Sequence, residues 1–141
     1  MATTGKKVFI SPNAFLAFIN RADPKHPQAV AFFRYFAQEN YRLYVDFLNI
    51  YETGRQIHFQ ISPSLARDFL RTIFITNINV IYPLESDIKT ALKTLVNYQS
   101  VDLTFDKAIM ATLANKNGIS QICTFEYLHP LFGLSVFYLP I

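Results

Sequence analysis

The sequence has one cysteine, four glycines, no tryptophan and no long uninterrupted hydrophobic run. The lone Cys123 cannot form an intrachain disulfide, and its apolar neighbours predict a buried thiol in a reducing compartment. No Gly-rich phosphate loop and no G-x-S-x-G nucleophile motif is present. No window approaches the run of about 18 apolar residues that spans a membrane. The apolar run at 8–10 is too short for a secretory signal, so we expect a cytoplasmic protein.

The remaining composition indicates a folded domain with a basic surface. The chain has 141 residues, of which 51% are hydrophobic and 16% charged, and this length suits one domain with a single substantial core. The net charge of +3 favours a polyanionic partner about as much as an ordinary basic surface. The three histidines share no zinc-ligand spacing. Five scattered basic residues are candidate phosphate contacts: Arg21, Lys25, Arg42, Arg55 and Lys107.

Short β-branched or apolar runs alternate with helical patterns along the chain. The sequence predicts strands at 7–10, 42–46, 79–82, 121–124 and 135–139. It predicts helices at 12–20, 28–40, from 47 past 57, from 63 past 74, at 86–98 and at 106–117. Ser11-Pro12 and Ser62-Pro63 each combine an N-cap with a proline suited to the first helical turn. This alternation predicts right-handed βαβ units and a central, mainly parallel sheet.

Three acids lie where apolar segments end or turn, namely Glu52, Asp106 and Glu126. In open parallel sheets, ligands bind at the carboxyl ends of the strands, so these distant carboxylates can be gathered into one cleft. Asp106 stands at the start of a helix, where the free N–H groups and the helix dipole stabilise a negative charge. The corresponding place after the first strand holds Ser11, which also serves as an N-cap.

Four blocks of the sequence, in order, resemble the PIN-domain family, the fold of the toxin ribonucleases of bacterial VapBC-type toxin–antitoxin pairs. The blocks are VFISPNAFLAF, YVDFLNIYETGRQI, LTFDKAIMATLANKNGI and QICTFEYLHPLFG. The resemblance covers nearly the whole chain. It implies a single domain over residues 1–141 with an α/β fold, a PIN-like three-layer α/β/α sandwich around a central, mainly parallel sheet.

The resemblance also implies a divalent-metal site for Mg²⁺ or Mn²⁺. Carried over position by position, Glu52, Asp106 and Glu126 fill three acid positions as metal ligands and catalytic residues, with Glu126 in place of the more usual Asp. Ser11 stands where the family usually has its first Asp, and this removes one negative charge from the site. Three supporting roles are hypotheses from the residues themselves: Asn13 orients a water or a carboxylate, Asp46 supplies a further acid to the cleft, and Thr124 hydrogen-bonds phosphate or carboxylate or else makes a local turn bond.

Three interpretations of function follow. The first is a metal-dependent endoribonuclease acting on RNA, a VapC-like toxin with a small antitoxin protein as its partner, whose activity Ser11 weakens or abolishes. The second is a non-catalytic PIN-like module that binds RNA or protein. The third is that Ser11 is an engineered change that silences a toxic enzyme. The aromatic helices at 12–20 and 28–40 predict a homodimer interface, an antitoxin groove, or both.

Overall fold

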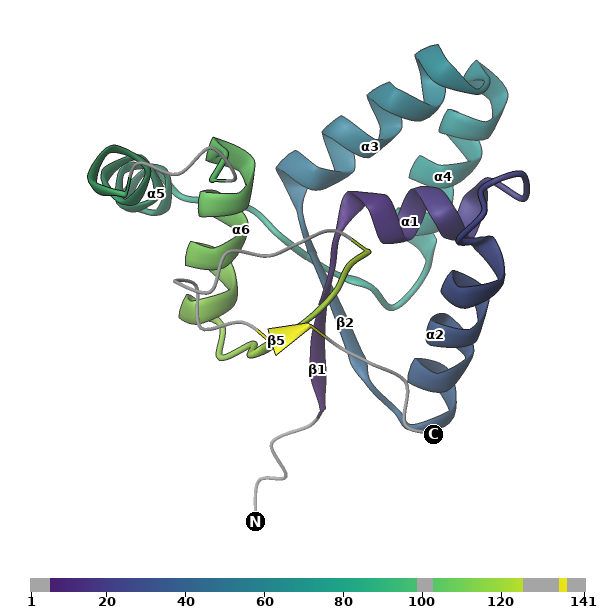
Figure 1. Ribbon diagram of the computed structural model, residues 1–141, viewed down its shortest axis with the longest axis horizontal. Coiled ribbons are helices and arrows are strands. Elements are labelled where there is room, and N and C mark those ends of the chain that lie inside the picture. Colours follow the sequence, from purple (N-terminus) through teal and green to yellow (C-terminus); the bar gives the residue numbers. More distant parts are fainter. Residues whose placement is uncertain (1–5, 99–102, 126–134, 137–141) are drawn as a thin grey trace.

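The computed structural model describes residues 6–98, 103–125 and 135–136. Within these ranges, five strands form one sheet that is covered by six helices (Figure 1). The elements follow one another as β1 (Lys7–Ile10), α1 (Pro12–Ile19), α2 (His26–Gln38), β2 (Arg42–Asp46), α3 (Phe47–Gln60), α4 (Pro63–Ile75), β3 (Asn79–Ile81), α5 (Glu85–Asn97), α6 (Phe105–Lys116), β4 (Gln121–Cys123) and β5 (Ser135–Val136).

The strands lie in the order β3-β2-β1-β4-β5, and all four described pairings are parallel. Phe9 of β1 is in register with Tyr44 on one side and with Ile122 on the other. The chain proceeds outward from β1 through β2 to β3 and then returns to add β4 on the opposite side of β1. The order of the strands therefore reverses between β1 and β4, which is the place where open α/β sheets form their binding crevices.

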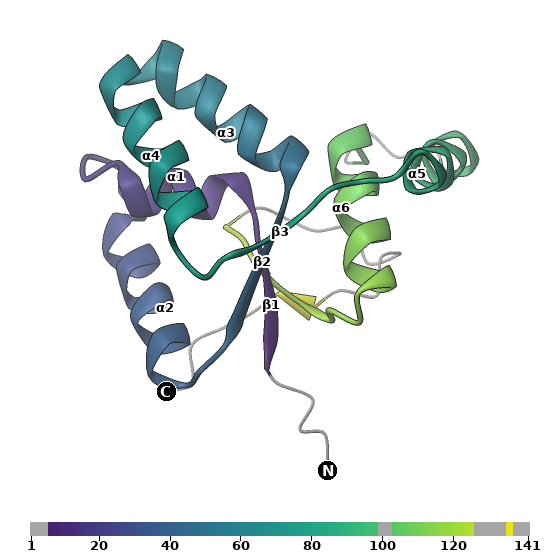
Figure 2. The same cartoon turned by 180° about the vertical axis from the view of Figure 1, so that it is seen from behind.

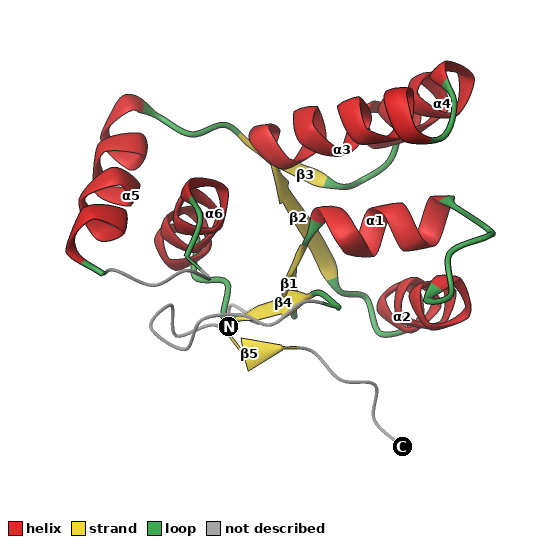
Figure 3. Cartoon of the chain, turned by 45° about the horizontal axis from the view of Figure 1, so that its top comes forward, coloured by secondary structure: helices red, strands yellow, loops and turns green. Residues whose placement is uncertain are grey.

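The helices form a layer on each face of the sheet. Helices α1 to α4 cover one face, and α5 and α6 cover the other (Figures 1 and 2). Successive residues of β1 point to opposite faces. Val8 and Ile10 accordingly join the core under α1 to α4, whereas Phe9 joins the core under α6. Figure 3, a view tilted from that of Figure 1, shows the same three layers. The three-layer α/β/α architecture is thus confirmed, with a sheet that is wholly parallel where it is described.

The local capping signals placed two helix starts correctly. Ser11 precedes α1 with Pro12 in its first turn, and Ser62 precedes α4 with Pro63 in the same place. The hydroxyl of Ser62 accepts a hydrogen bond from the backbone N–H of Leu65 at 3.0 Å. These starts could be predicted because the interactions that stabilise them lie within four residues of sequence.

Helix α2 begins earlier than the sequence indicated. It was predicted at 28–40, after a loop at 21–27, but it runs from His26 to Gln38. Pro27 lies in its first turn, where a proline removes no helical hydrogen bond, so it does not end the preceding loop as we expected. Asn40 follows the helix with a φ of 56°. Asparagine tolerates this left-handed conformation, which reverses the chain into β2.

Two helices expose part of the face that was predicted to be buried. On α4, the periodicity placed Leu70 and Phe74 in the core, but they are 36% and 58% exposed. On α5, Ile88 and Leu92 are likewise exposed, and only Ala91 of that predicted face is fully buried. Both helices lie at the outside of their layers and pack through a narrower stripe than an inner helix uses. The sequence period identifies an apolar face but not how much of it another element covers.

The predicted burial of Cys123 is confirmed, and the described helices agree with the prediction that no segment spans a membrane. Cys123 is buried at the end of β4, and burial raises its pKa to about 12, as expected for an inert core thiol. None of the described helices is long and apolar enough to cross a membrane. Of the last predicted strand, at 135–139, only Ser135 and Val136 lie within the described residues, and Glu126 lies outside them.

Candidate active site at the carboxyl ends of the strands

A hollow of about 160 Å³ opens at the reversal point between β1 and β4. Its lining comes from the start of α1, one side of α3, the first two turns of α6 and the end of β4. The lining residues are Ser11, Pro12, Asn13, Leu16, Asn49, Glu52, Gln56, Asp106, Lys107, Met110, Ile122 and Thr124. We call this hollow the acidic cleft. Side chains from both helical layers line it, at the carboxyl ends of the strands.

Glu52 and Asp106 enter the acidic cleft from opposite helical layers. Glu52 is half-buried on α3, where its Oε1 accepts a hydrogen bond from the Gln56 side chain, one turn later, at 3.3 Å. Asp106 is exposed in the first turn of α6, as the sequence predicted from helix-start chemistry. Lys107 lines the same cleft. The structure therefore brings two of the three predicted acids together and adds a positive charge beside them.

Ser11 lines the cleft but uses its polar groups on the protein itself. Its backbone N–H donates to the carbonyl of Cys123 at 3.1 Å, which ties the end of β1 to the end of β4. Its hydroxyl accepts from the N–H of Ala14 at 3.4 Å and caps α1. Ser11 is almost completely buried. Its structural role as an N-cap is thus present whether or not the cleft binds a metal.

Asn13 spans the reversal point with its side chain. Its amide nitrogen donates to Thr124 Oγ1 at 2.9 Å, and its amide oxygen accepts from the backbone N–H of Phe125 at 2.8 Å. The predicted role of Asn13 was to orient a water or a neighbouring carboxylate. In the structure it holds the segment that leaves β4, immediately before Glu126. Thr124 lines the cleft through this arrangement.

Asp46 is buried near the acidic cleft and is not one of its lining residues. It is 1% exposed at the end of β2, and its Oδ2 accepts from the N–H of Asn49 at 3.2 Å, which caps α3. The pKa of Asp46 is raised to about 6, chiefly by burial and also by the nearby charge of Asp106, while hydrogen bonds from backbone N–H groups oppose the shift. Asp46 and Asp106 are therefore close enough to interact electrostatically.

Three buried polar atoms next to the cleft have no hydrogen-bond partner among the described residues. They are Asp46 Oδ1, Asn49 Nδ2 and Thr53 Oγ1. All belong to the end of β2 or the first two turns of α3, and Asn49 itself lines the acidic cleft. Buried polar groups are nearly always hydrogen-bonded, so a concentration of unpaired ones is typical of a place that binds water or a ligand.

The donor set in the cleft consists of oxygen ligands suited to a hard cation. Across residues 6–98, 103–125 and 135–136, no three His, Cys, Asp or Glu side chains are grouped closely enough to hold a metal by themselves. Mg²⁺, however, is commonly bound by only one or two carboxylates together with water and substrate phosphates. Glu52 and Asp106 meet that smaller requirement. The third predicted acid, Glu126, is not among the described residues.

Two cleft residues were missed by sequence reasoning, Asn49 and Gln56. They lie three residues before and four residues after Glu52, so all three share one side of α3. This spacing is visible in the sequence once Glu52 is singled out. Of the five candidate phosphate contacts, Lys107 lines the cleft and the other four do not.

Comparison with known proteins supports the fold. No protein-family model and no curated sequence matches the chain. Among solved structures, the Mycobacterium tuberculosis toxin VapC20, described as cleaving the sarcin-ricin loop, superposes with a TM-score of 0.76 at 18% identity, over 84% of this chain and 89% of that one. VapBC2 from Rickettsia felis, bound to a DNA fragment from its promoter, superposes with a TM-score of 0.66 at 12% identity over 92% and 96%.

A third similar structure, FitAcB from Neisseria gonorrhoeae, gives a TM-score of 0.60 at 9% identity over 93% of this chain and 96% of that one. These similarities extend over most of the length of both chains in each pair. At such low identities they show a shared fold, the VapC-like PIN fold, and do not transfer an activity.

Proposed function

We propose that the chain is a divalent-metal-dependent endoribonuclease of the VapC toxin type. The observation that carries this proposal is the meeting of Glu52 and Asp106, which come from α3 and α6, in one cleft at the strand reversal. The fold supports it, because that cleft occupies the place where open α/β sheets bind ligands. The toxin role rests on similarity to solved structures that include a toxin and a VapBC pair.

Each cleft residue has a chemical role in this proposal. Glu52 and Asp106 hold Mg²⁺ or Mn²⁺, with Glu126 as the third acid that the sequence supplies. The metal, when bound, polarises the scissile phosphate and lowers the pKa of an attacking water. Lys107 contributes positive charge against the phosphate, and Asn13 holds the segment that carries Glu126. Asp46 supports the site from below, at the end of the neighbouring strand.

Cleavage of a fluorescently labelled RNA with and without Mn²⁺ or Mg²⁺ tests this proposal. We expect metal-dependent cleavage that Glu52→Gln and Asp106→Asn each reduce by at least about a hundredfold, since each removes a charge from the metal site. Glu85→Gln, which removes an exposed carboxylate outside the cleft, is the matched control and should retain most activity. If wild type cleaves nothing and Ser11→Asp restores cleavage, the natural sequence is a non-catalytic PIN-like module.

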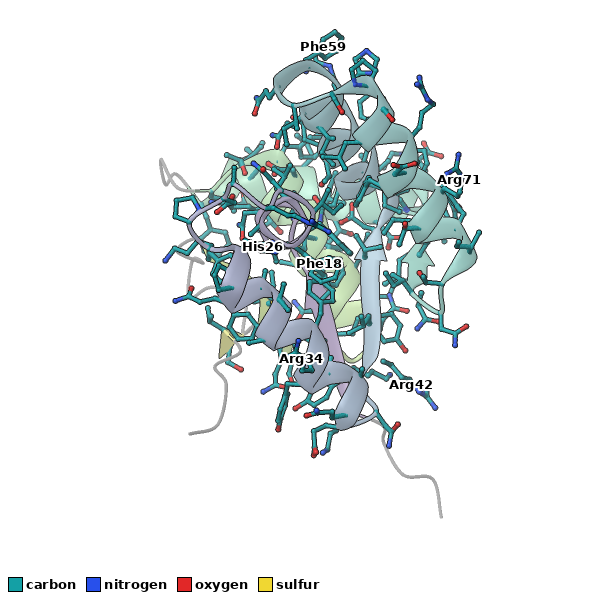
Figure 4. The ribbon with its side chains drawn as sticks, turned by 90° about the vertical axis from the view of Figure 1, so that its right-hand side faces the viewer. Phe18, His26, Arg34, Arg42, Phe59 and Arg71 are labelled. Atoms are coloured by element: carbon teal, nitrogen blue, oxygen red, sulfur yellow. The ribbon has the colours of Figure 1, made fainter. Side chains whose placement is uncertain are left out.

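The proposed antitoxin partner has a suitable surface on the other side of α1. A second hollow, of about 690 Å³, lies between α1, α2, α4 and β2, and Asp68 is its one charged lining residue. Phe18, which is 38% exposed, lies at this hollow (Figure 4), where its ring packs 4.4 Å from that of Phe33. An amphipathic helix from a small protein could bury its apolar side there.

The predicted homodimer remains a proposal, but we now place its interface on a different helix. The rings expected to form it are largely part of the core: Phe15 and Phe36 are buried, and Phe32 and Phe33 pack against that core. A better candidate is the exposed side of α5, where apolar residues recur at every fourth position: Leu84, Ile88, Leu92 and Val96. Light scattering of wild type and of Leu92→Glu tests it. A wild type that is monomeric at high concentration contradicts it.

A further inference from the structure

A third hollow, a groove, runs along α3. It has a volume of about 550 Å³ and lies between α3 and α4. We call it the aromatic groove. Its lining residues are Phe47, Ile50, Tyr51, Gly54, Arg55, His58, Phe59, Ala66, Arg67, Leu70 and Phe74. No residue of this lining belongs to the acidic cleft, but Tyr51 adjoins Glu52, so α3 forms a wall of both.

Three aromatic rings of the aromatic groove are largely exposed to solvent. Tyr51, Phe59 and Phe74 are 60%, 74% and 58% exposed, whereas the aromatic residues of α1 and α2 mostly pack inward. Figure 4 shows Phe59 at the outer tip of the α3–α4 pair. From Phe47 to Phe59 the helix rises by about 18 Å, so the rings are spread along an extended path. Exposed rings along such a path are suited to stacking against flat ligands.

The charges on this groove are all positive. Arg55 and Arg67 line it, and among the described residues no acidic side chain does. The Arg55 guanidinium lies 5.6 Å from the centroid of the Phe59 ring, which places a cation directly on an aromatic platform. The neighbouring acid on α4, Asp68, is instead part of the apolar hollow near α1 and forms an ion pair with Arg71. The electrostatic field of the aromatic groove therefore favours an anion.

We propose that the aromatic groove binds single-stranded RNA, whose bases stack on Tyr51, Phe59 and Phe74 and whose phosphates contact Arg55 and Arg67. Stacking platforms interleaved with basic side chains are the features by which proteins bind single strands without reading their sequence. Helix α3 lines both the groove and the acidic cleft, so a strand that passes around α3 can occupy both. The proposal rests on the proposed ribonuclease function, which it extends by assigning the part of the substrate outside the scissile bond.

A second copy of the chain fits this groove less well. A two-fold dimer uses the same patch on both subunits, so Arg55 and Arg67 would face the same basic residues with no acid to pair them. RNA supplies both of the complementary features, a flat apolar face and a negative backbone. A protein partner thus becomes an alternative that the experiment can detect.

The test measures binding of the full-length chain to a labelled single-stranded oligouridylate by fluorescence anisotropy, in EDTA so that no metal-dependent cleavage occurs. We expect Phe59→Ala to weaken binding by roughly five- to a hundredfold, the usual effect of losing one stacked base. Arg67→Ala should weaken it and reduce the slope of log affinity against log salt by about one. Both side chains are exposed, so neither change should impair folding.

Two matched controls lie on α4, the helix that carries Arg67, outside the groove. Ile75→Ala removes a comparably exposed apolar side chain, and Arg71→Ala removes an arginine that is paired with Asp68. Both should leave the affinity within about twofold of wild type. Equal losses in the control variants, or no loss with Phe59→Ala and Arg67→Ala, overturn the proposal. So does a wild-type dimer that Phe59→Ala converts to monomer in light scattering, because a second copy would then cover the groove.

The experiments distinguish a failure of the RNA-binding proposal from a failure of the ribonuclease proposal. Glu52→Gln should reduce metal-dependent cleavage by at least about a hundredfold and yet bind oligouridylate in EDTA no more weakly than wild type does, because it removes a negative charge. If it keeps cleavage, the acidic cleft is not the active site, while the groove result stands by itself. If wild type cleaves RNA but does not bind oligouridylate, the ribonuclease stands and the groove proposal is wrong.

Discussion

The side-chain amide of Asn13 connects the start of α1 to the residue after β4 through a 2.9 Å hydrogen bond to Thr124 Oγ1. Its oxygen accepts a second bond from the N–H of Phe125. A single side chain thus joins the two segments between which the strand order reverses. Because both polar ends of the amide are used, no shorter or apolar residue can replace it without leaving a donor unpaired.

Asn13→Ala should therefore lower the free energy of unfolding by about 1 to 3 kcal/mol, the usual cost of leaving a buried group unsatisfied. Urea denaturation followed by circular dichroism measures this change. Thr124→Val, which removes only the hydroxyl acceptor, should have a smaller effect. If Asn13→Ala is as stable as wild type, the amide does not hold the two segments together.

Ser11→Asp should strengthen metal binding while preserving α1. Aspartate is as good an N-cap as serine, so the helix start is retained. The new carboxylate adds a negative charge to the cleft that already contains Glu52 and Asp106, and we expect Mn²⁺ affinity to rise by about tenfold. Isothermal titration calorimetry gives the affinity. Ser11→Ala is the control: it should cost about 1 kcal/mol of stability through loss of the cap and bring no gain in affinity.

The buried carboxyl of Asp46 should make the protein less stable as the pH rises. Its pKa is raised from 3.8 to about 6 on folding, so between these values the folded state holds a proton that the unfolded state has released. This contribution to stability is complete below pH 3.8 and is lost as the pH rises through 6, with a magnitude of roughly 3 kcal/mol. Asp46→Asn, which keeps the cap, should abolish that slope in urea titrations from pH 4 to 7.

The same variant tests whether Asp46 serves the metal site. If Asp46 supplies an acid to the acidic cleft, Asp46→Asn should weaken Mn²⁺ binding. An unchanged affinity would remove Asp46 from the site and leave it as the cap of α3 alone.

Asp87 should show the opposite pH dependence. It accepts a hydrogen bond from the backbone N–H of Leu84 at 2.9 Å and contacts Lys116 of α6 at 3.1 Å, and these lower its pKa, the backbone bond having the larger effect. Its stabilisation is therefore present at neutral pH and lost on acidification through the lowered pKa. Asp87→Asn should cost about 1 to 3 kcal/mol at pH 7 and progressively less below pH 4, measured by urea denaturation.

Glu85→Gln is the matched control for Asp87→Asn. Glu85 forms an ion pair with Lys89 on the same helix, but both side chains are more than 70% exposed, and such pairs contribute about 0 to 1 kcal/mol. If Glu85→Gln lowers the free energy of unfolding as much as Asp87→Asn does, the ion pair between Asp87 of α5 and Lys116 of α6 contributes no more than an exposed ion pair.

The elements of the fold could be predicted where the deciding interactions are local. Ser11-Pro12 and Ser62-Pro63 placed the starts of α1 and α4 because a cap acts within one helical turn. The start of α2 was misplaced because a proline is compatible with a loop and with a first turn. The exposure of Phe74 was missed because the packing of α4 depends on elements far from it in sequence.

The site was predictable in its residue types and less so in its arrangement. Asp106 was singled out at a helix start and Glu52 through the resemblance of its block to the PIN family, and the structure places both in one cleft. The burial of Asp46 and the bridging role of Asn13 depend on neighbours more than thirty residues away, which no local pattern reveals. Asn49 could have been found from its helical spacing to Glu52.

The hydrogen bond from the Ser11 N–H to the carbonyl of Cys123, together with the bond from the Phe125 N–H to Asn13, has an experimental use. Both amide protons are protected only while the two halves of the sheet edge stay together. Their exchange with deuterated solvent therefore reports the opening of the acidic cleft directly. A ligand that bridges α3 and α6 should slow both amides by the same factor, giving a measure of occupancy that requires no catalysis.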